Sequence, residues 1–385
     1  MPPVPVLWVT GAPGVGKSTA GWALYTRLAS ADDRVAYVDI DQLRLFVPAP
    51  ADDPERHRLK ATNLLEVIDT FRRNGARQVI VSGVVDPHRG IEPYVRGTEA
   101  EYEFTLVRLR CARDELRRRY LGRGSSGECL DELMSLADKL DRDGLGVPLD
   151  TTTRSPHEVV EALIERVDRQ QQEHSIWSGT QTVHRRLGAD VPVLLLVNPT
   201  AVGKSAVGWE VMQSLGAKGV TAAYIDVDQL GFVQPECGPV KAEALTGVWR
   251  GYRAAGARAL IVVARGAPPA YEPALAGENL TTVCLDASPT DLADRVARRG
   301  QGGWPWLAGD SLTGAPDWRL AQVTSRAVAE RTIFHRRLSD ATTVIDTSIR
   351  SSRAVVATLT TLLTAAAASR SVAVADRTPP SGQSL

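Results

Sequence analysis

The segment Gly11-Ala12-Pro13-Gly14-Val15-Gly16-Lys17-Ser18 decides the fold of this chain of 385 residues. Glycines at these spacings let backbone N–H groups turn inward and approach a phosphate that a Cβ would obstruct. An apolar run over 5–10 precedes the segment and a helical pattern over 17–30 follows it, so a helix dipole adds its positive end. This context predicts a phosphate-binding loop between a strand and a helix.

A second, partly eroded copy of the loop lies 187 residues further along. It keeps Gly203, Lys204 and Ser205 but has Asn198 and Ala201 in place of glycines. The chain has only six lysines, which makes the match of Lys204 with the lysine of the first loop more telling. Asn tolerates a positive φ, so the turn can survive; a relic that keeps the fold without turnover is the alternative.

Four further landmarks recur in the same order. They pair 37–43 with 224–230, 75–81 with 256–262, 114–124 with 290–300, and 149–154 with 345–350. Together with the loops they indicate an ancestral duplication. We therefore expect an N-terminal domain over 1–172, a linker over 173–189, a degenerate C-terminal domain over 190–368 and a disordered tail over 369–385.

Each copy alternates apolar runs with helical stretches, which predicts an α/β fold. In the first copy we expect strands near 5–10, 34–39, 78–82, 103–109 and 146–150, and helices near 17–30, 56–74, 112–121, 128–142 and 155–170. Strand runs that are apolar throughout are typical of strands covered on both faces. The sequence thus predicts two tandem P-loop domains, each with a mostly five-stranded parallel sheet between helices.

Composition narrows the class of protein. Lys plus Arg equals Asp plus Glu at 45 each, which argues against nucleic acid as a partner. The four cysteines are scattered, so we expect neither disulfides nor a zinc site and favour a reducing cytosol. The first ten residues read as a strand rather than as a signal peptide, and no apolar run is long enough to span a membrane.

Two carboxylates close the second predicted strand. Asp39 and Asp41 would face the same side if the strand continues through both, at the edge where open α/β sheets bind substrates. A carboxylate there can accept the proton of a substrate hydroxyl during phosphoryl transfer. The alternative is a strand-end Asp that caps the next turn.

Arginines follow the fourth predicted strand. Arg119 and Arg123 are spaced i, i+4 on one helical face, before a flexible Gly-Ser segment, and can act as a lid over a transferring phosphoryl group. Arg295 and Arg299 repeat the spacing, and a solvated basic face is the alternative reading. After the third strand, Ser82 stands where many P-loop proteins have an acidic residue, so Asp39 or Asp86 would have to support the metal.

These motifs resemble the small-molecule kinases of the P-loop kinase superfamily. The run from Asp39 to Arg44 looks like the motif of adenylylsulfate kinases; gluconate kinases have a similar acidic patch, and chloramphenicol phosphotransferases place an Asp near Asp41. The resemblance implies a five-stranded parallel sheet, an arginine-bearing lid and Asp41 as the base that activates the substrate. It does not name the acceptor, and the choice of ATP rests on analogy.

The sequence therefore predicts a cytoplasmic phosphotransferase that uses ATP and Mg²⁺ on a small hydroxyl-bearing metabolite, with the N-terminal half catalytic and the two halves packed on each other. An ATP-binding switch without phosphotransfer is the alternative. The expected catalytic residues are Lys17, Asp41, Arg119 and Arg123; the nucleotide-binding residues are Gly11, Gly14, Gly16, Lys17, Ser18 and Thr19 with Gly203, Lys204 and Ser205; and the metal ligands are Ser18 and Asp39.

Overall fold

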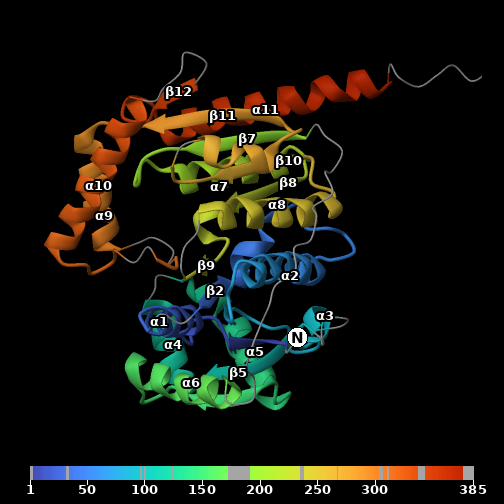
Figure 1. The fold of residues 1–385 in the computed structure, drawn as a ribbon, viewed down its shortest axis with the longest axis vertical. Coiled ribbons are helices and arrows are strands. Elements are labelled where there is room, and N and C mark those ends of the chain that lie inside the picture. Colours follow the sequence, from blue (N-terminus) through green and yellow to red (C-terminus); the bar gives the residue numbers. More distant parts are fainter. Residues whose placement is uncertain are drawn as a thin grey trace, which may run out of the picture.

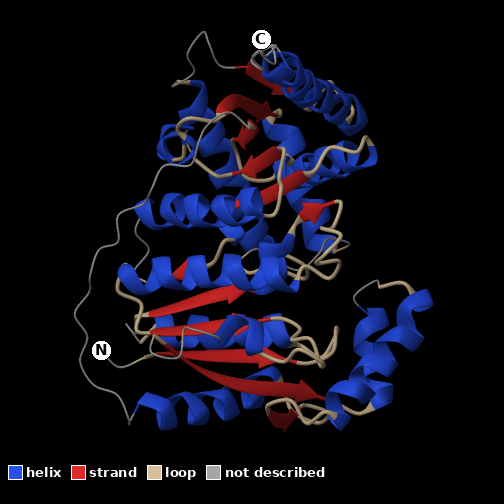
Figure 2. Ribbon diagram, turned by 90° about the vertical axis from the view of Figure 1, so that its right-hand side faces the viewer, coloured by secondary structure: helices blue, strands red, loops and turns tan. Residues whose placement is uncertain are grey.

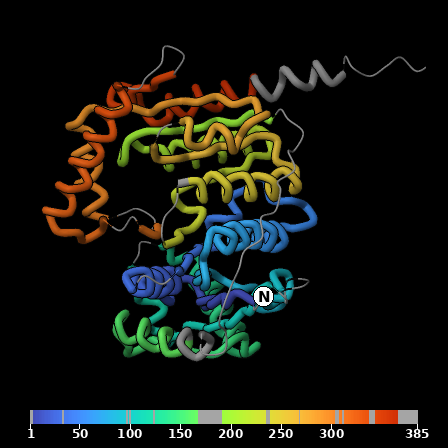
Figure 3. The backbone as a smooth tube through the Cα atoms, in the orientation of Figure 1, coloured from blue at the N-terminus to red at the C-terminus, as the bar shows by residue number. Residues whose placement is uncertain are grey.

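Two six-stranded sheets form the frame of the protein (Figures 1 and 2). The computed structural model describes residues 3–375 except 32–33, 96–97, 99–100, 123–124, 172–190, 235–237, 267, 303–306, 310–311 and 337–342. The predicted linker over 173–189 thus lies wholly outside the described residues. The N-terminal part of the chain builds the lower sheet in the view of Figure 3, and the C-terminal part builds the upper one.

The two sheets have matching strand orders. The first runs β6-β5-β1-β4-β2-β9 and the second runs β12-β11-β7-β10-β8-β3. In each sheet five strands are parallel and the sixth is antiparallel, which confirms the predicted fold class. The strands span β1 (Val4–Thr10), β2 (Val35–Asp39), β3 (Phe46–Val47), β4 (Gln78–Ser82), β5 (Tyr102–Arg110), β6 (Val147–Asp150), β7 (Pro192–Val197), β8 (Ala222–Asp226), β9 (Phe232–Val233), β10 (Ala259–Val263), β11 (Asn279–Asp286) and β12 (Thr343–Asp346).

Helices cover both faces of each sheet. Val6 and Trp8 of β1 join a core that reaches both sheets, whereas Leu7 and Val9 join a separate core beneath the first sheet. This alternation explains why β1 is buried throughout and apolar over most of its length. The helices are α1 (Lys17–Ala29), α2 (His57–Arg73), α3 (Glu92–Val95), α4 (Arg113–Gly122), α5 (Leu130–Arg142), α6 (Pro156–Gln171), α7 (Lys204–Ala217), α8 (Gly238–Ala254), α9 (Pro289–Gln301), α10 (Asp317–His335) and α11 (Ser352–Ala375). Among the described residues, no helix combines the length and the apolar character that crossing a bilayer requires.

The last helix corrects the predicted tail. We expected disorder from 369, but α11 continues to Ala375. The stretch 365–375 is rich in alanine, the best helix former, and contains neither Pro nor Gly, so the helix has no reason to stop at 369.

The halves exchange their shortest strands. β3 of the N-terminal half pairs with β8, and β9 of the C-terminal half pairs with β2. The Tyr252 hydroxyl fastens the first exchange by accepting a hydrogen bond from the Leu45 N–H at 2.9 Å. Neither strand was predicted, because two residues show no alternation of polar and apolar side chains.

Helices α2 and α8 pack against each other between the sheets (Figure 1). Gly247 and Gly251 of α8 make the close approach possible: a Cβ on Gly251 would lie 2.0 Å from Asn63 Oδ1, and one on Gly247 would lie 2.9 Å from Glu66 Oε2. Across the same interface Arg250 forms an ion pair with Glu66 at 3.1 Å.

Replacing Gly251 with alanine tests whether this contact holds the halves together. Asn63 is fully buried, and its amide donates to the Leu43 carbonyl at 2.8 Å, so it has no room to retreat. We expect Gly251→Ala to destabilise the chain by about 1–3 kcal/mol, measured by thermal or urea unfolding. The matched control is Gly122→Ala, where a Cβ meets nothing within 4 Å. Equal stability of the two variants would contradict the close-contact account.

Candidate functional site

The first phosphate loop has the backbone conformation that its glycines allow. Gly11, Gly14 and Gly16 all have positive φ, at 136°, 90° and 103°. A Cβ on Gly11 would stand 2.3 Å from the Leu109 carbonyl oxygen, so the position also needs glycine for space. Helix α1 starts at Lys17, whose Nζ donates to the Ala12 carbonyl at 3.0 Å. The loop N–H groups and this lysine are therefore placed around one small volume.

The second loop keeps the same shape although two of the three glycines are replaced. Asn198 has φ 109° and Ala201 has φ 67°, matching the signs at Gly11 and Gly14. Lys204 lies buried, as Lys17 does, and donates to the Asn198 carbonyl and to the Pro199 carbonyl at 2.9 Å. A positive φ costs conformational energy for a residue other than glycine. Asparagine can offset part of this cost through local hydrogen bonds of its side chain, but alanine has no polar side chain. The eroded loop is thus held in a phosphate-loop conformation against local preference.

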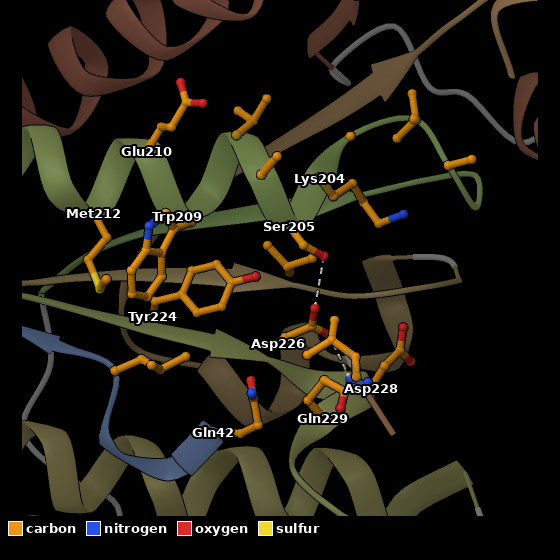
Figure 4. A pocket seen from close by; sticks show the side chains of 18 of the residues that line it. Gln42, Lys204, Ser205, Trp209, Glu210, Met212, Tyr224, Asp226, Asp228 and Gln229 are labelled. Atoms are coloured by element: carbon orange, nitrogen blue, oxygen red, sulfur yellow. Dashed lines mark hydrogen bonds between the residues drawn. The ribbon is translucent and has the colours of Figure 1, made fainter. Parts of the chain in front are cut away.

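A serine and a buried aspartate meet at each loop. Ser18 Oγ donates to Asp39 Oδ2 at 3.0 Å, and Ser205 Oγ donates to Asp226 Oδ2 at 2.9 Å (Figure 4). Burial, helped by the neighbouring charge of Asp41, raises the pKa of Asp39 to about 6; burial and Asp228 do the same for Asp226. A hydroxyl beside a pair of crowded carboxylates supplies the oxygen ligands that Mg²⁺ prefers.

Asp41 does not continue the strand. β2 ends at Asp39, whose carboxylate accepts the Asp41 N–H at 3.1 Å and so caps the 3₁₀ turn Ile40–Arg44. The expectation that both carboxylates share a strand face is therefore wrong, because the cap turns the chain. Asp41 lies in that turn beside Arg44, at 3.3 Å, and its side chain is 40% exposed. Asp228 differs, because Arg265 Nε holds it at 2.6 Å.

Arg119 joins the two ends of the predicted nucleotide site. Its guanidinium donates to the Val15 carbonyl at 3.3 Å, to Thr151 Oγ1 at 3.0 Å and to the Thr151 carbonyl at 2.8 Å. Arg295 repeats this pattern with Val202 and Thr347. Arg119 therefore ties the phosphate loop to the loop after β6. Arg123 lies outside the described residues, and Thr19 is an exposed residue of α1.

Two basic side chains near Asp41 and Asp86, Lys60 and His57, were not predicted from the sequence. Lys60 of α2 is 4% exposed, and burial lowers its pKa while the charges of Asp41 and Asp86 raise it. The Asp86 Oδ2 atom also lies 3.1 Å from His57 Nε2. The loop over 86–89 is held by the Asp86 carboxylate, which accepts two of its own N–H groups. One pattern could have revealed Lys60: it matches Lys241 at an offset of 181, so four of the six lysines fall in repeated positions.

The second loop opens into a cavity of about 1160 Å³ that both halves line. Asp226 and Asp228 line this cavity. Gln42 of the N-terminal half also lines it, and its side chain points toward the helix that carries Ser205 (Figure 4). Trp209 flanks this loop and is 43% exposed. The corresponding Trp22 beside the first loop is partly buried, with its ring centroid 4.7 Å from that of Phe232.

Comparisons with known proteins agree with this geometry. A family model described as an AAA domain matches residues 7–134. A probable adenylyl-sulfate kinase from Archaeoglobus fulgidus is 34% identical over 107 residues, which cover 28% of this chain. The chain thus spans 66% of the length of this curated relative.

Solved structures resemble about two fifths of the chain. A tunicamycin resistance protein from Deinococcus radiodurans is 18% identical and aligns over 42% of this chain and 95% of its own, with a TM-score of 0.34. A gluconokinase from Sinorhizobium meliloti is 16% identical over 45% of this chain and 100% of its own, with a TM-score of 0.30.

The strand, loop and helix around Gly11 define a P-loop protein, since the loop lies between β1 and α1 in a parallel sheet. The family match over 7–134 and the adenylyl-sulfate kinase relative make this part of the chain similar to proteins of the P-loop kinase superfamily.

Acidification tests the proposed metal ligands. Because the pKa of Asp39 is raised to about 6, a proton competes with a cation for its oxygens below that pH. In an Asp226→Asn background, which silences the second site, we expect the affinity for Mg²⁺ in the presence of ATP to fall about tenfold per pH unit below pH 6. Calorimetric titration between about pH 5 and about pH 7.5 measures it.

The control for this titration is Asp39→Asn in the same background. It should bind the cation weakly and show only the pH dependence of ATP itself. A wild-type Asp39 profile that matches the control would exclude this carboxylate as a ligand.

Proposed function

We propose that the protein is a phosphotransferase that uses ATP and Mg²⁺ to phosphorylate a small hydroxyl-bearing molecule, with the N-terminal half as the catalytic half. The observation that carries the proposal is the grouping at the first loop: a glycine-built phosphate loop, the Ser18–Asp39 pair and a partly exposed Asp41 just beyond it. The adenylyl-sulfate kinase relative supports a kinase in general.

Each residue has a role that its position supports. Lys17 would hold the β- and γ-phosphates, and Ser18 with Asp39 would hold Mg²⁺. The bound cation would neutralise charge on the phosphates. Asp41 would accept the proton of the acceptor hydroxyl, and its 40% exposed side chain leaves room for that contact.

The remaining predicted residues would position the nucleotide. Arg119 fixes the distance between the phosphate loop and Thr151, so it acts on nucleotide geometry through these contacts. Arg123 stays a prediction for the lid.

The C-terminal half is the weaker candidate for catalysis. Its counterpart of the base, Asp228, forms an ion pair with Arg265 at 2.6 Å, and this pair is partly buried. A carboxylate held this closely by a guanidinium is less free to meet a hydroxyl. At Asp41 the partner Arg44 is 3.3 Å away, and the Asp41 side chain is 40% exposed against 26% for Asp228, so solvent screens this pair more.

The strand exchange favours a second candidate, an ATP-binding switch. The segment that follows Asp41 continues directly into β3, which belongs to the other sheet. Nucleotide binding beside Asp41 could therefore be transmitted to the C-terminal half without phosphotransfer.

The two candidates separate in Asp41→Asn. For a phosphotransferase we expect normal MgATP binding and a loss of transfer of roughly 100-fold or more, because a general base typically contributes that much. The assay follows radiolabelled γ-phosphate into a metabolite pool. A switch without phosphotransfer would keep its response to MgATP in this variant.

Comparison of the two loop lysines tests which half is catalytic. Lys17→Ala should abolish labelled product, whereas Lys204→Ala should retain it, since the carboxylate beside the first loop is more exposed than Asp228 and is held less closely by its arginine. Labelled product that persists in Lys17→Ala and disappears in Lys204→Ala would reverse the assignment.

A further inference from the structure

The cavity at the second loop is strongly basic. Nine of its lining residues are Lys or Arg and four are Asp or Glu, although the whole chain is balanced at 45 of each sign. A concave surface of one sign concentrates ligands of the opposite sign. The cavity is therefore suited to a ligand with several negative charges.

The loop at one end of this cavity has polar groups without partners. Asn198 Nδ2 and Thr200 Oγ1 are buried and form no hydrogen bond with the described residues. Both side chains are more than nine-tenths buried, and Thr200 lines the cavity. Buried polar atoms that lack a partner are costly, so these two atoms indicate that a polar group binds at this loop.

The second loop also binds an anionic oxygen of its own chain. The Thr200 N–H donates to Glu330 Oε2 of α10 at 2.7 Å. The first loop has Pro13 at the corresponding position, which offers no N–H. This contact shows that the loop presents its backbone donors to negative oxygen, and that Glu330 would compete with a phosphate.

The N-terminal half contributes two arginines to the lining of the cavity, Arg44 and Arg56. Arg56 has φ 59° at the start of α2 and donates through Nε to the Phe46 carbonyl at 3.0 Å. Within the described residues no carboxylate forms an ion pair with Arg56, and the charge of Arg44 acts with burial to lower its pKa. An arginine at a cavity wall that forms no ion pair with a carboxylate is suited to bind phosphate oxygens.

We propose that the second loop binds the polyphosphate of a second nucleoside triphosphate, in a composite site that Arg56 and Arg44 of the N-terminal half complete. The site then belongs to both halves, since the strand exchange carries 41–47 to the rim of the C-terminal loop. Entry of the phosphates displaces the Glu330 carboxylate from the Thr200 N–H. The proposal concerns binding, so it stands whether or not the first site transfers phosphate.

Binding stoichiometry tests the second site. The full chain with Lys17→Ala, which disables the first loop, is titrated with MgATP by calorimetry. We expect one nucleotide per chain, and none when Lys204→Ala is added. If the Lys17→Ala chain binds no MgATP, the second site does not exist.

The contribution of the N-terminal half is tested in the same Lys17→Ala background. Arg56→Asn removes the charge but keeps a residue that tolerates positive φ. We expect it to weaken MgATP binding about tenfold, the value of one charge-assisted hydrogen bond. The control is Arg58→Asn two residues on, whose arginine is exposed and paired with Asp52. Equal affinity in the two variants would confine the site to the C-terminal half and overturn the composite proposal.

A second variant, Glu330→Gln, tests the same site in case Arg56→Asn does not fold. Glu330→Gln removes the competing charge on a side chain that is 32% exposed. We expect it to bind MgATP several-fold more tightly, because phosphate no longer displaces a carboxylate. Unchanged or weaker binding would contradict the proposed position of the polyphosphate.

Discussion

The exchange of β3 and β9 is the constraint on which both sites depend. Each exchanged strand begins within a few residues of the acidic pair of its own half, so the turn that carries Asp41 or Asp228 is stretched between two sheets. The strand fixes one end of the turn, and the cap formed by Asp39 or Asp226 fixes the other. The position of a carboxylate in one half is thus set partly by the sheet of the other half.

The same exchange explains why two similar loops have different surroundings. Phe232 follows β8 across to the first sheet, where it packs with Trp22, Tyr25 and Tyr37. Its counterpart Leu45 is smaller, and Trp209 remains partly exposed beside the cavity. One site is therefore flanked by packed aromatic rings, and the other by open space rimmed with arginines.

Most of the framework could be predicted from the sequence, because buried parallel strands are nearly continuous apolar runs and the loop marks the first strand–helix junction. Predicted bounds such as 78–82 and 155–170 lie within a residue or so of β4 and α6. The exchange could not be predicted, since a two-residue strand carries no periodicity. Asp41 was assigned to the strand because the capping role of Asp39 depends on a turn that only the fold reveals.

Lys60 shows why the rest of the site was missed. In the sequence it lies in a charged stretch, Glu55 to Lys60, that is typical of an exposed helix start. In the structure the packing of α2 against α8 buries it near Asp41 and Asp86. Its counterpart Lys241 has a different use: it donates to the Asp228 carbonyl at 3.2 Å and lies 4.6 Å from the centre of the Phe232 ring. Burial decided by tertiary packing leaves no trace in local residue patterns.

Mutual exchange of strands is an arrangement familiar from twofold-symmetric dimers, here present on one polypeptide. In a dimer of identical subunits every substitution appears at both sites. When the two copies are joined in one chain, each copy can change alone. For example, Gly231 stands at the position equivalent to Arg44, and Arg265 forms an ion pair with Asp228. Covalent linkage therefore keeps the strand exchange between the two halves and allows their two sites to differ in sequence.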